Sequence, residues 1–167
     1  MIALVRVDNR LVHGQILEAW APRLKVKRVI IADDEAAASP LARAAMTLAL
    51  PPELPATVLP IADLDYGALA AAPEAVLLLF REVAGLARAV AAGLTPALAP
   101  HVNLGNVHYA PGRRPVTPSV FLSDEEVVTM QELSAAGFEV DARAVPSDAP
   151  TGPRELRQKY DAAGQRG

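Results

Sequence analysis

The side chains best suited to carry out a chemical reaction lie in one segment, Arg6 to Gln15, which reads Arg-Val-Asp-Asn-Arg-Leu-Val-His-Gly-Gln. No other stretch of the chain places a nucleophilic side chain so close to anion-binding side chains. A histidine such as His13 offers a neutral, nucleophilic imidazole nitrogen near neutral pH. Arg10, three residues earlier, can offer two parallel N–H groups to phosphoryl oxygens. We therefore expect this segment to hold a phosphoryl group on His13.

The neighbours of His13 have supporting roles in this interpretation. Gly14 permits close approach of backbone N–H groups, and the start of the following helix adds a favourable field for an anion. Gln15 can donate a further hydrogen bond. Asp8 would repel a phosphoryl group, so we expect it to orient the nearby arginine or to fix the tautomer of His13. Arg6 is expected to pair with Asp8 or to bind the phosphoryl group.

These side chains need a scaffold, and the hydrophobic pattern predicts alternating strands and helices. Apolar runs predict strands over residues 2–7, 28–32, 56–59, 75–80, 101–104 and 138–145. The two prolines in residues 113–121 favour edge strands or a small irregular hairpin there over a central strand. Helices are predicted over residues 14–24, 40–50, 61–70, 82–92, 123–136 and 154–163. This alternation predicts an α/β fold, an open and mostly parallel sheet with helices on both faces in three layers.

Local signals mark the ends of several helices. Ser39 and the proline after it match an N-cap and a first helical residue. Ser123 and Glu126 have the spacing of a capping box. Gly93 matches the residue that closes a helix. Pro22 should end or kink the first helix, because proline cannot donate the helical hydrogen bond.

In parallel α/β sheets, ligands bind at the edge where the strands have their carboxyl ends. This rule brings together the loops that begin at Asp8, Asp33, Arg81, Gly105 and Pro146. Asp33, Asn103 and Gly105 are therefore candidates for a pocket beside His13. Plainer interpretations compete, since the acidic run 33–35 is predicted to be a turn rather than a metal site, and residues 103–106 can form a turn without a ligand.

The bulk properties exclude several classes of function. The chain has 167 residues, 51% hydrophobic and 21% charged, which predicts one domain over 1–167 with residues 164–167 frayed. A formal net charge of -3 argues against nucleic-acid binding. Cysteines and nucleotide-binding glycine motifs are absent, so we expect no disulfide, nucleotide, metal or other cofactor. Neither a signal peptide nor a run of roughly 20 apolar residues is present, which suits a cytoplasmic protein that does not span the membrane.

The segment Arg6 to Gln15 resembles the start of the IIB component of the mannose/fructose/sorbose family of the sugar phosphotransferase system (PTS), where the pattern is Arg-Ile-Asp-Asp-Arg-Leu-Ile-His-Gly-Gln. Weaker similarities continue at Trp20 and in residues 29–35, 103–105, 120–126 and 145–148. The resemblance implies an open α/β fold and a phosphocarrier that needs no cofactor. It implies that a IIA protein phosphorylates His13, that Arg10 contacts the phosphoryl group, and that a sugar on the membrane pair IIC/IID receives it.

Two residues depart from the family pattern: Asn9 replaces an aspartate, and Pro22 lies where the first helix usually continues. Only the IIB part is present, so a second function stays open, a regulatory phosphocarrier or phosphate-binding signalling module not coupled to transport. An α/β hydrolase is disfavoured because no Gly-x-Ser-x-Gly motif is present. The sequence does not determine the sugar, the phosphorylated ring nitrogen or the oligomeric state, and it is compatible with a homo-oligomer.

Overall fold

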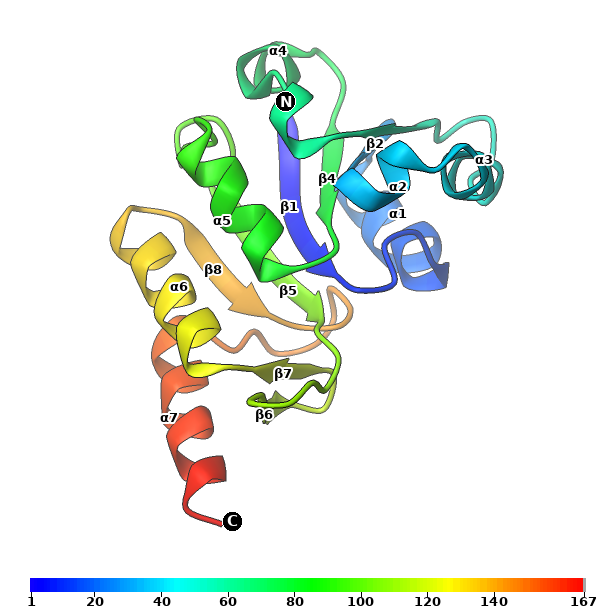
Figure 1. Ribbon diagram of the computed structural model, residues 1–167. Coiled ribbons are helices and arrows are strands. Elements are labelled where there is room, and N and C mark those ends of the chain that lie inside the picture. Colours follow the sequence, from blue (N-terminus) through cyan, green and yellow to red (C-terminus); the bar gives the residue numbers. More distant parts are fainter. Residues whose placement is uncertain (167) are drawn as a thin grey trace.

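The computed structural model describes residues 1–166 and is built on a six-stranded sheet in the order β3-β2-β4-β1-β5-β8. All neighbouring strands in this sheet are parallel (Figure 1). The strands are β1 Ile2–Asp8, β2 Arg28–Ala32, β3 Ala56–Leu59, β4 Val76–Phe80, β5 His101–Asn106 and β8 Glu139–Ala142. An antiparallel hairpin follows β5 and consists of β6 Arg114–Thr117 and β7 Val120–Leu122. The predicted open, parallel sheet and the predicted hairpin are both confirmed.

The two innermost strands differ in one respect that matters for the site. β4 is buried at all five positions and is entirely apolar, as expected of a strand covered by helices on both faces. β1 pairs with β4 on one side and with β5 on the other. It too is largely buried, although Arg6 and Asp8 are charged. Charged groups in such a position need partners, because burying an unpaired charge is costly.

Helices cover both faces of the sheet, each set above its own hydrophobic cluster (Figure 1). The first face carries η2 Ile61–Asp63, α4 Tyr66–Ala71, α5 Val83–Ala91, α6 Asp124–Ala135 and α7 Pro153–Gly164. The second face carries η1 Ile16–Trp20, α1 Ala21–Leu24, α2 Asp34–Ala38 and α3 Pro40–Leu48. Along β1, Val5 and Val7 contribute to the first cluster and Leu4 to the second, which is the alternation that a strand imposes.

The predicted helix ends are confirmed at three places. Ser39 is the N-cap of α3, and its side chain accepts a hydrogen bond from a backbone N–H three residues on. Ser123 and Glu126 form the complete capping box of α6. Gly93 follows the C-cap of α5 with a φ of 116°, a conformation that favours glycine.

The prediction of a turn over residues 33–35 is wrong, because α2 begins there. Asp33 is the N-cap of this helix, and its carboxylate accepts a hydrogen bond from the backbone N–H of Ala36 at 2.7 Å. Asp34 and Glu35 form the first turn. Acidic side chains are favourable at this end of a helix, where the backbone N–H groups are unpaired.

Two predicted helices are interrupted. Residues 16–20 form the π-helix η1 before α1, and this wider turn precedes Pro22, which cannot donate a hydrogen bond to the residue four positions earlier. Helix α1 then ends at Lys25, which has a φ of 54°. The predicted helix over 61–70 is divided into η2 and α4, because the side chain of Asp65 caps α4.

The remaining differences concern element ends. β5 continues through Asn106, so residues 105 and 106 are part of a strand and not a turn. β8 ends at Ala142, earlier than the predicted residue 145. α7 continues to Gly164, so this residue is helical and not frayed. The predicted fraying of Gly167 lies outside the described residues.

Candidate functional site

Asp8, the last residue of β1, is the centre of the site. Its Oδ2 accepts hydrogen bonds from Arg6 Nη2 at 2.9 Å and Arg10 Nη2 at 3.0 Å, and it lies 2.9 Å from His13 Nε2. Its Oδ1 accepts from the backbone N–H and the Nε–H of Arg10 at 3.1 and 3.0 Å. A tight turn brings these groups together, since the N–H of Leu11 donates to the Asp8 carbonyl at 2.9 Å.

Leu11 fixes the shape of this turn. Its φ of 55° lies in the left-handed region, which costs a residue other than glycine about 1–2 kcal/mol. Its side chain is fully buried in the second hydrophobic cluster, together with Ile16 and Trp20. Burial of a leucine stabilises by an amount of similar size, about 1.5–3 kcal/mol. Packing therefore holds the turn from the side opposite to Asp8.

The buried carboxylate of Asp8 remains ionised. Burial by itself raises the pKa of Asp8, but hydrogen bonds from His13 and Arg10 and the charge of Arg6 outweigh it, so the pKa lies well below its usual range. An ionised carboxylate can only accept hydrogen bonds. The hydrogen between Asp8 and His13 is therefore carried by Nε2 of the imidazole.

His13 is held through one nitrogen and lies at the start of the helix. Its side chain is 14% exposed. The carbonyl of His13 accepts the backbone N–H of Ile16 at 3.0 Å, which places the histidine at the first helical turn. Among the described residues, no group makes a hydrogen bond to Nδ1. A proton on Nε2 leaves the lone pair on Nδ1, so this nitrogen is the nucleophilic one.

Arg6 does not reach the surface. Its Nη2 donates to Asp8 and to the carbonyl of Ala144 at 3.1 Å. Its Nη1 donates to the side chain of Asn103 and to the carbonyl of Arg143 at 3.3 Å. Burial lowers the pKa of Arg6, and the charge of Asp8 opposes this shift. Arg6 therefore pairs with Asp8, and its predicted role as a phosphoryl ligand is corrected, because a fully buried guanidinium cannot touch an incoming group.

Asn103 and Gly105 support Arg6 from inside the protein. The side chain of Asn103 accepts from Arg6 and donates to Asp141 at 2.6 Å. A Cβ atom at position 105 would overlap the guanidinium of Arg6, so glycine is required there by close approach. The expectation that these two residues line a pocket beside His13 is therefore corrected.

The sequence interpretation missed the segment that closes this side of the site, residues 143 and 144 after β8. The carbonyl of Ala144 accepts hydrogen bonds from Arg6 and from the indole N–H of Trp20, the latter at 2.9 Å. The guanidinium carbons of Arg6 and Arg143 lie 5.0 and 5.7 Å from the centre of the Trp20 ring, within the range of cation–π attraction. Trp20 is itself buried.

Asn9 connects the turn to both neighbouring strands. Its Nδ2 donates to the carbonyl of Arg81 at 2.9 Å, and its Oδ1 accepts the backbone N–H of His108. Its own backbone N–H donates to the carbonyl of Asn106 at 3.0 Å. An ionised aspartate has no donor for the bond to Arg81. The departure from the family pattern therefore has a structural role in this chain.

The other predicted phosphoryl ligands lie near the surface, unlike Arg6. They are Arg10, Gly14 and Gln15. The side chain of Arg10 is 34% exposed and holds Asp8 through Nε and Nη2. Its Nη2 also donates to Oε1 of Gln15 at 3.0 Å. A Cβ atom at Gly14 would meet only Oε1 of Glu18, at 4.0 Å, so packing within the chain does not require glycine there.

Asp33 belongs to a second polar cluster. Its carboxylate accepts two hydrogen bonds from Arg81, at 2.7 and 3.0 Å. Burial raises the pKa of Asp33, but the hydrogen bonds from Arg81 and from the backbone N–H of Ala36 reverse the direction, so the pKa is lowered. The cavity beside this cluster, about 190 Å³, includes no residue of the segment from Arg6 to Gln15. The hydrogen bonds of Asp33 thus go to Arg81 and Ala36, and the structure does not bring it into contact with His13.

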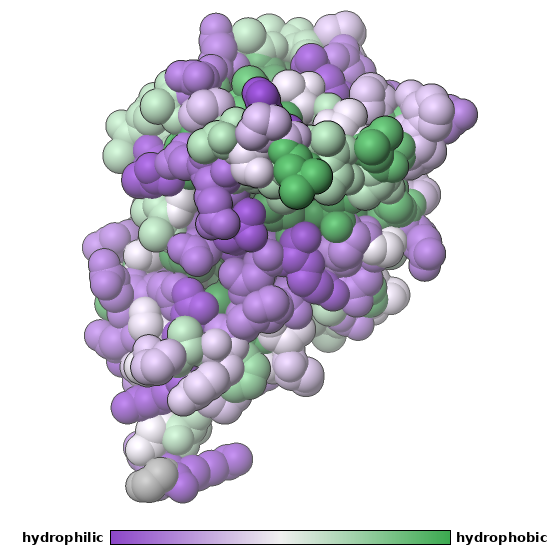
Figure 2. Space-filling view, turned by 45° about the vertical axis from the view of Figure 1, so that its right-hand side comes forward, coloured by the Kyte–Doolittle hydropathy of each residue, from purple (hydrophilic) through white to green (hydrophobic). Residues whose placement is uncertain are grey.

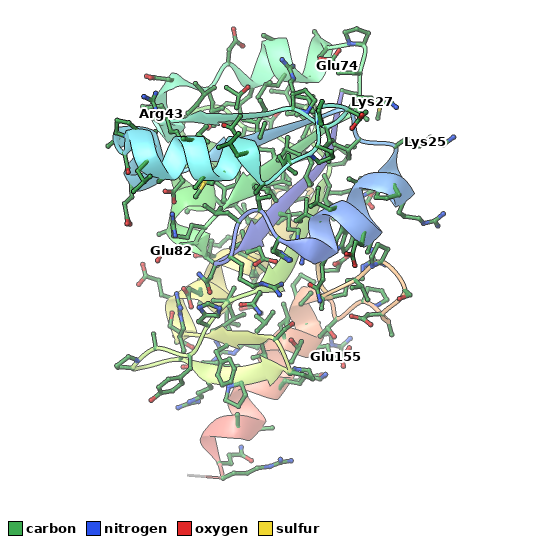
Figure 3. All side chains as sticks on the ribbon, turned by 90° about the vertical axis from the view of Figure 1, so that its right-hand side faces the viewer. Lys25, Lys27, Arg43, Glu74, Glu82 and Glu155 are labelled. Carbon is green, nitrogen blue, oxygen red and sulfur yellow. The ribbon has the colours of Figure 1, made fainter. Side chains whose placement is uncertain are left out.

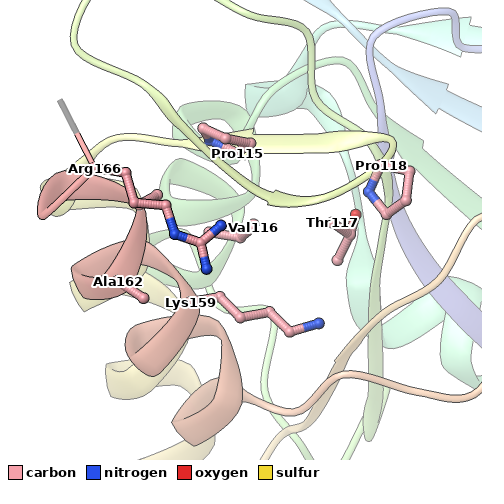
Figure 4. A pocket seen from close by; sticks show the side chains of 8 residues that line it. Pro115, Val116, Thr117, Pro118, Lys159, Ala162 and Arg166 are labelled. Carbon is pink, nitrogen blue, oxygen red and sulfur yellow. The ribbon is translucent and has the colours of Figure 1, made fainter.

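A further cavity of about 520 Å³ lies between β6 and α7, with Lys159 and Arg166 extending over it (Figure 4). None of the predicted site residues lines this cavity.

Within residues 1–166, no group of three or more His, Cys, Asp or Glu side chains is arranged to hold a metal ion. Over the same range, none of the helices has the length and apolar character that crossing a bilayer requires.

Comparison with known proteins identifies relatives along nearly the whole chain. The family model described as the PTS system sorbose subfamily IIB component matches residues 2–164. The mannose-specific EIIAB component of Escherichia coli K12 is 30% identical over 163 residues, 96% of this chain and 50% of the relative. The sorbose-specific EIIB component of Klebsiella pneumoniae is 29% identical over 149 residues, 88% of this chain and 89% of the relative. The chain thus spans about half the length of the mannose-specific relatives.

Solved structures agree with this assignment. The IIBSor domain of the sorbose permease from Klebsiella pneumoniae has a TM-score of 0.81 and 26% identity, covering 95% of this chain and 97% of that one. The structure of manxB from Thermoanaerobacter tengcongensis has a TM-score of 0.82 and 28% identity, with 96% of each chain covered. Fold and sequence lead to the same family: this chain belongs to the sorbose subfamily of PTS IIB components.

Proposed function

We propose that this IIB component is a phosphocarrier, a phosphotransferase of the PTS type. It accepts a phosphoryl group on His13 from a phosphohistidine of a IIA protein. It then passes the group to a sugar held by the membrane components IIC and IID. Both phosphoryl transfers take place in the cytoplasm, at the inner face of the membrane. Family membership and the geometry around Asp8 support this proposal.

The observation that carries the proposal is the 2.9 Å contact between Asp8 Oδ2 and His13 Nε2. Because Asp8 is ionised, Nε2 is the nitrogen that bears hydrogen, and Nδ1 bears the lone pair. A buried carboxylate fixes the tautomer of a reacting histidine in the same way in other catalytic sites. We therefore assign Nδ1 of His13 as the phosphoryl acceptor.

The two transfer steps follow from this tautomer. In the first, the lone pair of Nδ1 attacks the phosphorus of the donor phosphohistidine, the donor N–P bond breaks, and the donor ring keeps the electron pair. The phosphorylated ring of His13 can then carry a positive charge, which Asp8 stabilises through Nε2–H. In the second step, a sugar hydroxyl oxygen attacks the phosphorus, the Nδ1–P bond breaks, and the hydroxyl proton leaves to water.

We propose that Arg10 binds the phosphoryl group while it is being transferred. During phosphoryl transfer, negative charge is spread over three oxygens, and positioned cations and N–H groups stabilise it. Arg10 keeps Nη1 for this purpose while Nε and Nη2 hold Asp8. The side-chain amide N–H groups of Gln15 and the backbone N–H groups at Gly14 add donors at the start of the helix.

The names of the relatives support the assignment of partners. The name of the Escherichia coli relative contains EIIAB, and this chain matches half of that protein, which supports a IIA donor. Relatives named as specific for mannose, sorbose and fructose each align with most of this chain. One IIB scaffold is thus shared by systems with different sugars, so we assign the choice of sugar to the membrane components.

A phosphorylation assay tests the proposal. The protein is incubated with phosphoenolpyruvate, the general PTS proteins and a cognate IIA, and its intact mass is measured. Wild type should gain one acid-labile phosphoryl group, and His13→Ala should gain none. His101→Ala and His108→Ala, which alter the other two histidines, should behave as wild type. Acid-labile phosphate on His13→Ala would refute the site, and an unphosphorylated wild type beside an active donor would refute the carrier function.

A further inference from the structure

A row of polar side chains crosses three neighbouring strands behind the site. In the strand register, Arg6 of β1 lies opposite Asn103 of β5, and Asn103 lies opposite Asp141 of β8. Side chains of register partners project from the same face of a sheet, so these three residues, the polar row, form one line. Arg6 and Asn103 are buried, and β8 is an edge strand. The polar row therefore connects the edge of the sheet with the strand that carries Asp8.

The two hydrogen bonds along the polar row run in the same direction. Nη1 of Arg6 donates to Oδ1 of Asn103, and Nδ2 of Asn103 donates to Oδ1 of Asp141 at 2.6 Å. A guanidinium offers only donors, and an ionised carboxylate offers only acceptors. Asn103 satisfies both neighbours in one orientation alone, with its oxygen toward Arg6 and its nitrogen toward Asp141. Arg6 and Asp141 together therefore fix the orientation of the amide between them.

The outer end of the polar row is held by the segment that follows β8. Arg143 donates to the carboxylate of Asp141, through Nε at 3.3 Å and through Nη2 at 2.9 Å. Its backbone carbonyl accepts a hydrogen bond from Nδ2 of Asn103 at 3.3 Å. This segment passes beside η1 and α1, where the indole N–H of Trp20 donates to it (Figure 3). Asp141 thus has a fixed place between Asn103 and Arg143, although its side chain is 21% exposed.

The inner end of the polar row meets the proposed acceptor histidine through one oxygen. Nη2 of Arg6 donates to Oδ2 of Asp8 at 2.9 Å, and the same oxygen lies 2.9 Å from Nε2 of His13. A displaced Arg6 would therefore move the acceptor that holds the imidazole. β1 ends at the level where hydrophilic side chains form a band across the surface (Figure 2). The polar row thus supports the site from the interior, behind this hydrophilic surface.

We propose that Asp141 is a positioning residue for the phosphoryl acceptor and acts through Asn103 and Arg6. It keeps the guanidinium of Arg6 where it holds Oδ2 of Asp8 against the imidazole of His13. Among the described residues, the hydrogen bonds of Asp141 go to Asn103 and to an arginine outside the site, so it does not touch the reacting group. The inference rests on the proposed function of His13. Its effect on the imidazole is present before any phosphoryl group arrives, so it can be measured separately.

Exchanging the two side chains tests this proposal by rapid-quench phosphorylation at saturating phospho-IIA. Asp141→Asn sets an amide N–H against a donor of Asn103 or Arg143, and Asn103→Asp sets two carboxylates in contact. Each change alone should lower the rate constant of phosphoryl uptake about tenfold, within the range expected for a small misplacement. The double variant again sets a donor opposite an acceptor. Its rate constant should return to within about threefold of wild type, a recovery that only coupled sites show.

The tautomer of His13 provides a second measurement, which needs no phosphoryl donor. Imidazole nitrogen NMR of the unphosphorylated protein, which has three histidines, should show wild-type His13 in the Nε2–H form alone. Asp141→Asn and Asn103→Asp should each show both ring tautomers, and the double variant should show the Nε2–H form again. Glu139→Gln is the matched control. It breaks an ion pair with His101, a register partner in the same two strands, and should leave both measurements unchanged.

Circular dichroism melting checks that each variant folds, and Asp141→Asn with its control decides the case if Asn103→Asp does not fold. An unchanged His13 tautomer or an unchanged rate constant in Asp141→Asn would overturn the proposal. So would a double variant as impaired as the single ones, or an effect confined to the phospho-IIA concentration at half-maximal rate. A wild type that takes up no phosphoryl group would instead refute the proposed function, and the tautomer comparison would still test Asp141.

Discussion

Asp8 and Asp33 are built alike at the same edge of the sheet, yet they have different roles. Each lies at the carboxyl end of a parallel strand, and each holds an arginine side chain through two hydrogen bonds. Asp33 also accepts a backbone N–H of α2 and therefore caps a helix. Asp8 instead contacts Arg6 behind it and His13 in front. In the proposed function, the two pairs differ because His13, the proposed nucleophile, contacts the carboxylate of Asp8 and not that of Asp33.

Replacing Asp8 should have the largest effect. In Asp8→Asn, the amide can donate to Nε2 of His13, so the ring hydrogen moves to Nδ1 and the nucleophile is lost. Phosphoryl uptake should fall by about a thousandfold or more, the scale of lost tautomer control in a carboxylate–histidine pair. Arg6 would also remain buried without an anion, which should lower the free energy of unfolding by about 3–5 kcal/mol. Rapid-quench phosphorylation and urea unfolding measure the two effects.

Asp33→Asn is the matched control. The asparagine keeps an N-cap acceptor, and Arg81 is partly exposed, so unfolding should lose only about 1–2 kcal/mol. Phosphoryl uptake should stay within about twofold of wild type, because Asp33 makes no contact with Asp8 or His13 among the hydrogen bonds and ion pairs of the described residues. Equal losses of phosphoryl uptake in Asp8→Asn and Asp33→Asn would show that the two carboxylates do not differ in their roles.

Replacing Arg10 and replacing Arg81 should have different effects on phosphoryl uptake, the next largest difference that we expect. Arg10→Ala removes the proposed phosphoryl ligand, so the rate of phosphoryl uptake should fall about a hundredfold, as for other lost transition-state donors. Its unfolding free energy should change by less than about 1 kcal/mol, because the side chain is partly exposed. Arg81→Ala should leave the uptake rate unchanged. A Kd for phospho-IIA that changes in Arg10→Ala with no change in the rate constant would reassign Arg10 to docking.

Gly105→Ala tests the buried support of Asp8 without changing any charge. The added methyl group would displace the guanidinium of Arg6, which should cost about 1–3 kcal/mol of unfolding free energy. A displaced Arg6 shifts Asp8, so uptake should fall about tenfold, within the range expected for a small misplacement. Gly152→Ala is the control, since no atom lies within 4 Å of its added Cβ. Normal uptake in Gly105→Ala would show that Arg6 does not position Asp8.

The pH dependence of stability should be a smaller effect with a definite sign. The pKa of Asp8 is lowered on folding from its ordinary value of 3.8. Its contribution to stability is therefore complete above pH 3.8 and is lost as the pH falls toward the lower folded value. The stability gap between wild type and Asp8→Asn should shrink over that acid range in urea unfolding. A gap that stays constant there would contradict the ionised state assigned to Asp8.

Much of the fold could be predicted because its signals are local. The apolar run of β4 and the capping box at Ser123 lie within a few residues of the elements that they define. Helix α2 was missed because five residues are too few for a helical hydrophobic period, and the informative signal was Asp33 followed by two more acids. The π-helix before Pro22 could not be predicted, since it depends on how the chain packs around the proline.

The site shows the same division between local and distant signals. Asp8, Arg10 and His13 lie within six consecutive residues, so the sequence alone could group them. The burial of Arg6 runs against the general rule that arginines are exposed. It depends on the carbonyl of Ala144, which the pairing of β5 with β8 brings close. No spacing in the sequence connects residues 6 and 144, and only the folded chain shows their contact.

The most direct test of the central claim is to identify the phosphorylated ring nitrogen. The nitrogen-labelled protein is phosphorylated through IIA, and phosphorus–nitrogen couplings in its NMR spectrum locate the bond. The structure predicts a phosphoryl group on Nδ1 of His13, with hydrogen retained on Nε2 toward Asp8. A phosphoryl group on Nε2, or on any residue other than His13, would contradict it.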